Sequence, residues 1–147
     1  MQGKLAVAAI MGDGRVALIE EDIQPTTEGY VLLEVKSSLV SPGTELGGWH
    51  MFAKGYGHPK PDGNPKPFGY SNSGVVLEVG EGVDEFKPGD RVAAIGMGYA
   101  RHATHALIPQ HLCVSLPDQV TFDQAAYAML SATALYAMRR GDPEFGE

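Results

Sequence analysis

Short apolar runs separated by turn residues make up most of the first 117 residues of the chain. The runs are rich in Val, Ile, Leu and Ala, and Gly, Pro or Asp stands near many of their ends. Runs of this kind are typical of the strands of a β-barrel or a β-sandwich. The pattern predicts strands over Leu5–Ile10, Val16–Glu20, Tyr30–Lys36, Ser73–Gly80, Arg91–Ile95, Ala106–Pro109 and Leu112–Leu116.

Two turn sequences support this interpretation. Residues 12–14 read Gly-Asp-Gly and lie between the first two apolar runs, which is a hairpin signal. Residues 87–90 read Lys-Pro-Gly-Asp, in which proline presets φ and glycine supplies a positive φ. Each turn leads into a predicted strand, so the chain is expected to be mainly β over this part.

The pattern changes after residue 120 to the spacing of an α-helix. Thr121 and Gln124 stand three residues apart, which is the spacing of a capping box. Apolar residues with high helix propensity follow at helical intervals. The sequence predicts one helix over Phe122–Arg140, with Gly141 in the left-handed position that ends it and Pro143 preventing its continuation.

Residues 47–67 show neither a helical nor a strand period and contain many glycines and prolines. A long segment without regular structure inside a compact domain is usually functional or disordered. Trp49, His50 and Tyr56 lie in it, so a loop that lines a substrate cleft is one interpretation. His50 is also a candidate proton relay by residue type. A surface excursion without function is the alternative.

Composition limits the kind of protein and the partners that are expected. The 147 residues are 44% hydrophobic and 20% charged, which is ordinary for one globular domain over 1–147. The formal net charge of −7, without a basic stripe, disfavours nucleic acid as a partner. No apolar stretch approaches the length of a membrane helix, so no membrane span is expected. The single cysteine, Cys113, excludes an internal disulfide and a multi-cysteine zinc site, and it fits a cytoplasmic location.

Four segments resemble the medium-chain dehydrogenase/reductase superfamily, whose members include alcohol dehydrogenases. The most specific one reads Phe-Gly-Tyr-Ser-Asn-Ser-Gly-Val-Val from residue 68, followed by Phe-Lys-Pro-Gly-Asp-Arg-Val from residue 86. Val40–Glu45 resembles the first active-site turn, Ala106–Asp118 the segment before the interdomain helix, and Ala125–Arg140 that helix. The resemblance implies a mainly β fold: a GroES-like, partly open β-barrel that shapes the substrate site. It also implies a C-terminal α-helix that leads to a separate Rossmann domain for NAD or NADP.

The nucleotide-binding half is not recognisable in these 147 residues. Gly96–Arg101 imitates the first half of a Gly-x-Gly-x-x-Gly fingerprint, but Arg101 stands at the third glycine and no helix pattern follows. The segment is interpreted as a glycine-rich turn, and no cofactor-binding residue is identified. The chain is therefore expected to be a truncated piece of a longer oxidoreductase and to be inactive alone. Its interdomain helix is expected to expose apolar positions and to favour self-association.

The resemblance also implies a zinc-lacking branch. Pro42, Tyr70 and Leu130 stand at or near the positions where zinc-dependent members carry their catalytic ligands. Proline and leucine have no ligand atom, whereas zinc requires thiolate, imidazole or carboxylate ligands. The alternative is a new zinc site made of three histidines, namely His102, His105 and His111. Strand alternation does not bring these side chains together, so surface or barrel-rim positions are expected for them.

A nicotinamide enzyme without a metal still needs a hydrogen-bond donor for the substrate oxygen. Tyr70 is the first catalytic candidate, and a ring that merely fills the space of the metal is the alternative. Thr44 matches the Ser or Thr that relays a proton in zinc-dependent members, with a simple turn residue as the alternative. Glu45 matches an acidic residue near the metal, although pairing with an arginine or capping a turn fits it better here. Ser71 and Tyr99 are further candidates for substrate contacts.

These features predict the substrate-side domain of a zinc-independent, NAD(P)-dependent alcohol dehydrogenase or ketone reductase that acts on a small molecule. A quinone or enoyl reductase of the same superfamily is the first alternative, although those enzymes usually carry asparagine before proline in the first turn. A stand-alone GroES-like binding module is the second alternative, and the predicted C-terminal helix argues against it. A zinc enzyme with unorthodox ligands is the third.

Overall fold

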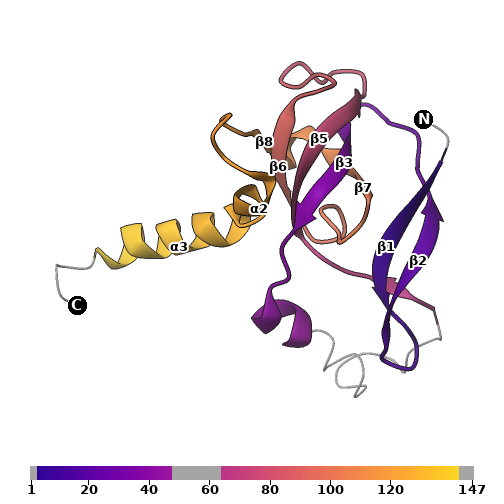
Figure 1. Cartoon of the computed structure of the whole chain (residues 1–147). Coiled ribbons are helices and arrows are strands. Elements are labelled where there is room, and N and C mark those ends of the chain that lie inside the picture. Colours follow the sequence, from indigo (N-terminus) through magenta and orange to yellow (C-terminus); the bar gives the residue numbers. More distant parts are fainter. Residues whose placement is uncertain (1–2, 48–63, 143–147) are drawn as a thin grey trace.

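The computed structural model of the protein describes residues 3–47 and 64–142. Its strands form two antiparallel sheets, and a helix at the C-terminal end extends away from them (Figure 1). The smaller sheet has the order β2-β1-β4, and the larger sheet has the order β7-β3-β5-β6-β8. The strands of the two sheets are β1 (Lys4–Ile10), β2 (Val16–Asp22), β3 (Tyr30–Ser38), β4 (Lys66–Pro67), β5 (Ser71–Val79), β6 (Arg91–Ile95), β7 (His105–Pro109) and β8 (Cys113–Ser115). A short 3-10 helix η1 (Gln110–Leu112) lies between β7 and β8. The mainly β class predicted from the sequence is confirmed.

Residues 101–104 join the two sheets. The N–H of Ala8 in β1 donates to the carbonyl of His102 (2.8 Å), and the N–H of Thr104 donates to the carbonyl of Ala6 (2.9 Å). β7 follows this segment at once and pairs with β3 in the larger sheet. The smaller sheet is thereby attached to the larger one, and the strands of the described residues form a partly open rather than a closed barrel.

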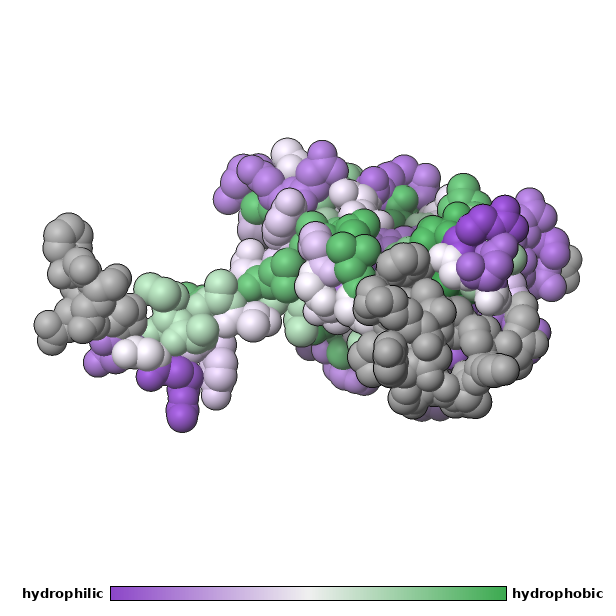
Figure 2. All heavy atoms as spheres, turned by 90° about the horizontal axis from the view of Figure 1, so that it is seen from below, coloured by the Kyte–Doolittle hydropathy of each residue, from purple (hydrophilic) through white to green (hydrophobic). Residues whose placement is uncertain are grey.

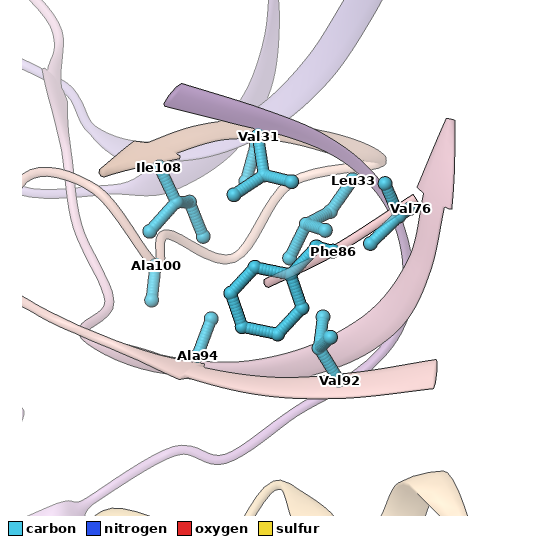
Figure 3. Packing of buried hydrophobic residues seen from close by; sticks show 9 residues of the cluster. Val31, Leu33, Val76, Phe86, Val92, Ala94, Ala100 and Ile108 are labelled. Atoms are coloured by element: carbon cyan, nitrogen blue, oxygen red, sulfur yellow. The ribbon is translucent and has the colours of Figure 1, made fainter. Parts of the chain in front are cut away.

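The larger sheet surrounds one hydrophobic core. Side chains from β3, β5, β6 and β7 point into it, and the ring of Phe86 fills its centre (Figure 3). Its buried members are Val31, Leu33, Val76, Phe86, Val92, Ala94, Ala100, Ala106 and Ile108. Leu32 belongs instead to a second cluster, with Leu5, Val7 and Ile23. Because both faces of β3 are covered, its first residues form a continuous apolar run rather than an alternating one.

The predicted C-terminal helix is interrupted. The structure has a short helix α2 (Phe122–Ala125) and a longer helix α3 (Ala128–Gly141), with a turn at residues 126 and 127. The prediction of one continuous helix is therefore wrong at this point. The left-handed residue that ends α3 is Asp142 (φ 43°), one position later than the predicted Gly141.

Two serines of β5 explain where the helix breaks. The hydroxyl of Ser71 donates to the carbonyl of Ala126 (2.7 Å), and the hydroxyl of Ser73 donates to the carbonyl of Phe122 (2.6 Å). These bonds dock α2 on the sheet and provide the Ala126 carbonyl with a partner outside the helix. The chain can therefore leave the helical path after α2 without leaving that carbonyl unsatisfied.

β5 begins two residues earlier than predicted, and hydrogen bonds of polar side chains again explain the difference. Ser71, Asn72 and Ser73 lack the apolar pattern of a strand, yet all three are buried, because their side chains are hydrogen-bonded inside the domain. β4 is not predicted, since two residues are too few to show a period. Leu112 lies in η1, so the last strand begins one residue later than expected.

α3 leaves the body of the domain (Figure 1). Several of its large apolar side chains are exposed to solvent. Hydrophobic surface gathers where this helix meets the body, on the face that Figure 2 shows. The exposed large apolar residues of this region are Tyr127, Leu130, Leu135, Tyr136 and Met138. Self-association through this helix stays a prediction. Among residues 3–47 and 64–142, none of the helices combines the length and the apolar character of a membrane span.

The capping box at the start of α2 is present as predicted. The Thr121 hydroxyl accepts from the N–H of Gln124 (3.2 Å), and the side-chain oxygen of Gln124 accepts from the N–H of Thr121 (3.0 Å). We expect Thr121→Ala to lower the free energy of unfolding by about 1 kcal/mol, because it removes one half of this reciprocal cap. Urea denaturation measures the change, and Thr121→Ser, which keeps the hydroxyl, is the control. An alanine variant as stable as the serine variant would show that docking on β5 alone holds α2.

Candidate functional site

The predicted donor Tyr70 lies in a segment that backbone hydrogen bonds hold on both sides. The carbonyl of Phe68 accepts from the N–H of His102 (3.0 Å), and the carbonyl of Tyr70 accepts from the N–H of Gly96 (2.9 Å). Gly69 stands between them with φ +108°, and a Cβ there would lie 2.6 Å from the backbone nitrogen of His102. Only glycine fits this conformation at this distance. The backbone of Tyr70 is therefore held in one place against residues 96–102.

Thr44 and Glu45 lie in a helical turn over residues 42–47, shortly after β3. The chain reaches this turn beside β5, because the N–H of Leu39 donates to the carbonyl of Ser71 (3.0 Å). The Glu45 carboxylate accepts from the N–H of Ser41 (3.2 Å), and the N–H of Glu45 donates to the carbonyl of Ser41 (2.9 Å). Glu45 thus caps the turn, which is one of the two structural roles expected for it.

Thr44 and Tyr70 line the same two cavities. The first, here called the inner cavity, has a volume of about 180 Å³, and its walls are Ile10, Thr44, Glu45, Pro67, Phe68, Gly69, Tyr70, Met97 and Gly98. The second, here called the helix-side cavity, has a volume of about 400 Å³, and its walls are Thr44, Tyr70, Ile95, Gly96, Met97, Met129, Leu130 and Thr133. The structure therefore brings the two predicted donors together where these cavities meet.

A third cavity adjoins the inner one and is almost entirely apolar. This apolar cavity has a volume of about 280 Å³, and its walls are Ile10, Val16, Val40, Glu45, Leu46 and Phe68. It shares Ile10, Glu45 and Phe68 with the inner cavity. Hydrocarbon walls of this kind suit an apolar ligand group, with the few polar side chains at one end fixing its orientation.

The carboxylate of Glu45 is buried against His102, a contact that the sequence pattern does not predict. Nε2 of His102 lies 3.0 Å from Oε2 of Glu45, and Nδ1 lies 2.9 Å from the hydroxyl oxygen of Ser38. The side chains of His102 and Glu45 are only 9% and 8% exposed. A carboxylate accepts only, so Nε2 donates to it, and in the neutral ring Nδ1 accepts from Ser38. The surface or rim position expected for His102 is therefore wrong, and the partner of Glu45 is a histidine instead of an arginine.

Ser71 and Tyr99, predicted to contact substrate, lie apart from this group. Ser71 is 1% exposed and its hydroxyl is bound to the Ala126 carbonyl, so its placement fits docking of α2 better than substrate contact. Tyr99 lines a separate cavity of about 530 Å³, where its ring centre lies 6.4 Å from that of Tyr30. A hydrogen bond with Tyr99 raises the pKa of Tyr30. Three further predicted residues lie outside the described part of the chain, namely Trp49, His50 and Tyr56.

The positions that match zinc ligands do not fit zinc. Tyr70 and Leu130 line the helix-side cavity together, and Pro42 lies in the helical turn after β3. Of these three side chains, only the phenol has a polar atom. No three His, Cys, Asp or Glu side chains in the described part of the chain are grouped to hold a metal ion. Burial raises the pKa of the Cys113 thiol to about 12, which disfavours the thiolate that a metal needs.

Several residues of the site are not predicted from the sequence, among them Ser38, Met97 and Met129, and His102 is considered there only as a ligand of an alternative zinc site. Met97 lies between two glycines of positive φ and is 77% exposed, yet it borders both the inner and the helix-side cavity. A large apolar residue at the tip of a glycine turn is the signal that points to it. His102 and Ser38 leave no such signal, because they stand 64 positions apart in the chain.

Comparison with known proteins identifies the family of this chain. Residues 27–118 match the family model of the alcohol dehydrogenase GroES-like domain. The chain belongs to this family. The resemblance to the medium-chain dehydrogenase/reductase superfamily is thereby confirmed, together with the GroES-like character of the barrel.

Two curated relatives of this GroES-like domain are oxidoreductases by name. It is 32% identical over 139 residues to the trans-enoyl reductase fsr4 of Gibberella fujikuroi, a match that covers 88% of this chain and 38% of that protein. It is 30% identical over 109 residues to the (R,R)-butanediol dehydrogenase of Bacillus subtilis, covering 56% and 31% of the two chains.

The fold of this GroES-like domain also matches a solved structure, the quinone oxidoreductase of Coxiella burnetii. The TM-score is 0.79 at 21% identity, and the match covers 99% of this chain and 47% of that one. This GroES-like domain therefore spans less than half of each of these three proteins.

Proposed function

We propose that this chain is the substrate-side domain of an NAD(P)-dependent reductase that works without zinc. The observation that carries the proposal is the meeting of Thr44 and Tyr70 at the junction of the inner and helix-side cavities. Two side chains with hydroxyl groups at such a junction can hold a carbonyl oxygen. The trans-enoyl reductase and the butanediol dehydrogenase among the relatives support an oxidoreductase. A second domain, which binds the nucleotide, completes the enzyme in this proposal.

The helix-side cavity fits the reactive end of the cofactor. Its volume of about 400 Å³ and its mainly apolar walls suit a planar ring, and it opens beside Thr44 and Tyr70. When bound, the dihydronicotinamide supplies a hydride to the substrate. The carbonyl oxygen of the substrate gains negative charge as the hydride arrives. The O–H groups of Thr44 and Tyr70 stabilise that charge by donating hydrogen bonds to it.

The side chains at the former metal positions support a reaction without zinc. Proline and leucine at positions 42 and 130 have no ligand atoms, and the one cysteine of the chain is held as a neutral thiol by burial. In this proposal the hydroxyl donors take over the polarisation of the carbonyl group that a metal ion provides elsewhere.

Reduction of a double bond conjugated to a carbonyl group is the reaction we propose first. The apolar cavity beside the inner cavity suits the hydrocarbon part of such a substrate. The relative that matches 88% of this chain is named as a trans-enoyl reductase. In this reaction the donors hold the oxygen of the conjugated carbonyl group while the hydride is added to the far carbon of the double bond. A proton from water then completes the reduction at the carbon next to the carbonyl group.

Interconversion of an alcohol and a ketone is the second candidate. The Ser-Pro-Gly-Thr-Glu turn at residues 41–45 favours it over double-bond reduction, and one relative is named as a butanediol dehydrogenase. The two reactions differ in the carbon that receives the hydride and place the same demand on Thr44 and Tyr70. A single protein preparation can therefore test both.

The test begins with the reading frame that contains this chain. We expect it to encode a strand followed by Gly-x-Gly-x-x-Gly after residue 147. The whole purified protein should oxidise NADPH or NADH with a 2-enoyl thioester or, for the second candidate, with a small ketone. After treatment with a zinc chelator, activity should stay within about twofold of the untreated enzyme, because no metal polarises the carbonyl group.

Two results would contradict the proposal. One is a reading frame without a nucleotide-binding domain. The other is activity that the chelator abolishes and added zinc restores. The discriminating control for substrate class is the saturated thioester of equal length, which has no double bond to reduce.

A further inference from the structure

We propose that His102 is a positioning residue: through Glu45 it holds the helical turn that presents Thr44 to the inner cavity. The catalytic consequence of this contact rests on the proposed function. The contact itself rests only on the geometry of the domain, so the two can be tested apart.

Every polar group of His102 is bound to a different element. Its N–H donates to the carbonyl of Phe68 (3.0 Å), and its carbonyl accepts from the N–H of Ala8 in β1 (2.8 Å). On the ring, Nδ1 lies 2.9 Å from Ser38 at the end of β3, and Nε2 lies 3.0 Å from Glu45 in the helical turn. The Phe68 ring packs edge-on against the imidazole, with the two ring centres 5.1 Å apart. The imidazole therefore has one orientation.

The backbone that carries His102 is held equally firmly. The side-chain amide of Asn72, which is fully buried in β5, donates to the carbonyl of Arg101 (3.1 Å). The guanidinium of Arg101 forms an ion pair with Glu21 of β2 (2.9 Å). Gly69 packs its Cα against the same stretch, so closely that a Cβ would overlap it. Both sheets therefore hold the backbone beside His102 in place.

The helical turn is joined to His102 through the carboxylate of Glu45. Its Glu45 carboxylate receives one hydrogen bond from the N–H of Ser41 and one from Nε2 of His102. A buried carboxylate that loses one of its donors is costly, and the cheapest relief is movement toward water. Because Thr44 directly precedes Glu45, such movement displaces the proposed donor from the cavity wall.

Two substitutions of His102 separate this role from packing. In His102→Gln the side-chain amide reaches the position of Nε2 and still donates to Glu45, whereas the contact with Ser38 is lost. In His102→Asn the shorter amide stands near the position of Nδ1 and keeps a partner for Ser38, whereas Glu45 loses its donor. Both variants replace a ring by an amide, so each is the control for the other.

The first measurement is amide hydrogen exchange in the chain itself. In His102→Asn we expect the amides of Ser41 and Glu45 to exchange at least about tenfold faster than in the parent, because the turn opens locally. In His102→Gln they should stay within about threefold of the parent. The amide of Val76, bound to the carbonyl of Asp90 in the larger sheet, should be unchanged in both. Equal exchange at residues 41 and 45 in the two variants, or faster exchange throughout the sheet, would overturn the proposal.

The second measurement is steady-state kinetics of the whole enzyme. Misplacing a catalytic group by about 1 Å costs up to about 100-fold in rate. We therefore expect kcat of His102→Asn to fall about 10- to 100-fold, and the glutamine to restore most of it, with KM changing less in both. If the turn exchanges faster in His102→Asn but kcat stays at the parental value, the positioning role is wrong. Absence of reductase activity in the parent would refute the proposed function while leaving the exchange result to decide on the contact.

Discussion

Replacing Gly74 with alanine will lower the free energy of unfolding by about 3 kcal/mol, because β3 and β5 approach too closely for a side chain at this point. A Cβ on residue 74 would lie 2.1 Å from the carbonyl oxygen of Glu34 and 3.0 Å from Cα of Val35. Both are backbone atoms, and Glu34 pairs with His105 of β7 on its other side. β3 therefore cannot move away from β5 without breaking its pairing with β7.

Urea denaturation of the chain measures this effect. A domain of ordinary stability has about 5–15 kcal/mol in total, so a loss of this size shifts the midpoint clearly. Gly3→Ala is the matched control, because its Cβ would meet only Cδ1 of Ile23 at 3.6 Å, an ordinary contact. We expect the control to stay within about 0.5 kcal/mol of the parent. Equal stability of the two variants would mean that β3 and β5 can separate freely at the irregular register between Val35 and Ser37.

For the enzyme proposed above, we expect removal of the Tyr70 hydroxyl to lower kcat by about 100-fold or more, the usual effect of losing one donor to a developing oxyanion. Tyr70→Phe keeps the ring in place between the inner and helix-side cavities and removes only the O–H group. It therefore distinguishes a catalytic donor from a ring that merely fills space. Thr44→Val makes the same test at the neighbouring position, and we expect a loss of similar size.

Steady-state kinetics with the substrate identified for the enzyme gives the answer. Tyr136→Phe is the control, because this tyrosine of α3 is 65% exposed and lines neither the inner nor the helix-side cavity. If Tyr70→Phe kept the parental kcat while Thr44→Val lost activity, Tyr70 would be a filler and Thr44 the donor. If both variants were as active as the Tyr136→Phe control, the assignment of the site to this junction would be wrong.

Part of this site follows from the local sequence. Thr44, Glu45 and Tyr70 stand in motifs that resemble a known family, and the structure brings Thr44 and Tyr70 to the same cavities. Ser71 stands in the same motif, but its hydroxyl serves the docking of α2. A motif predicts which segment reaches the site. It does not predict which of two neighbouring side chains points into it, because that depends on the strand face and on what packs against each face.

The sequence by itself determined the strands other than β4, apart from a few of their end residues, as well as the turns and the capped start of the helical region. Each of these depends on residues within one turn or strand, and their propensities and apolar periods are local properties. The tertiary structure alone decided the break of the helix at residues 126 and 127 and the burial of His102 between Ser38 and Glu45. These depend on hydrogen bonds between residues 55, 64 and 57 positions apart in the chain. A polar side chain is buried only where distant segments supply its partners, and no local pattern records that.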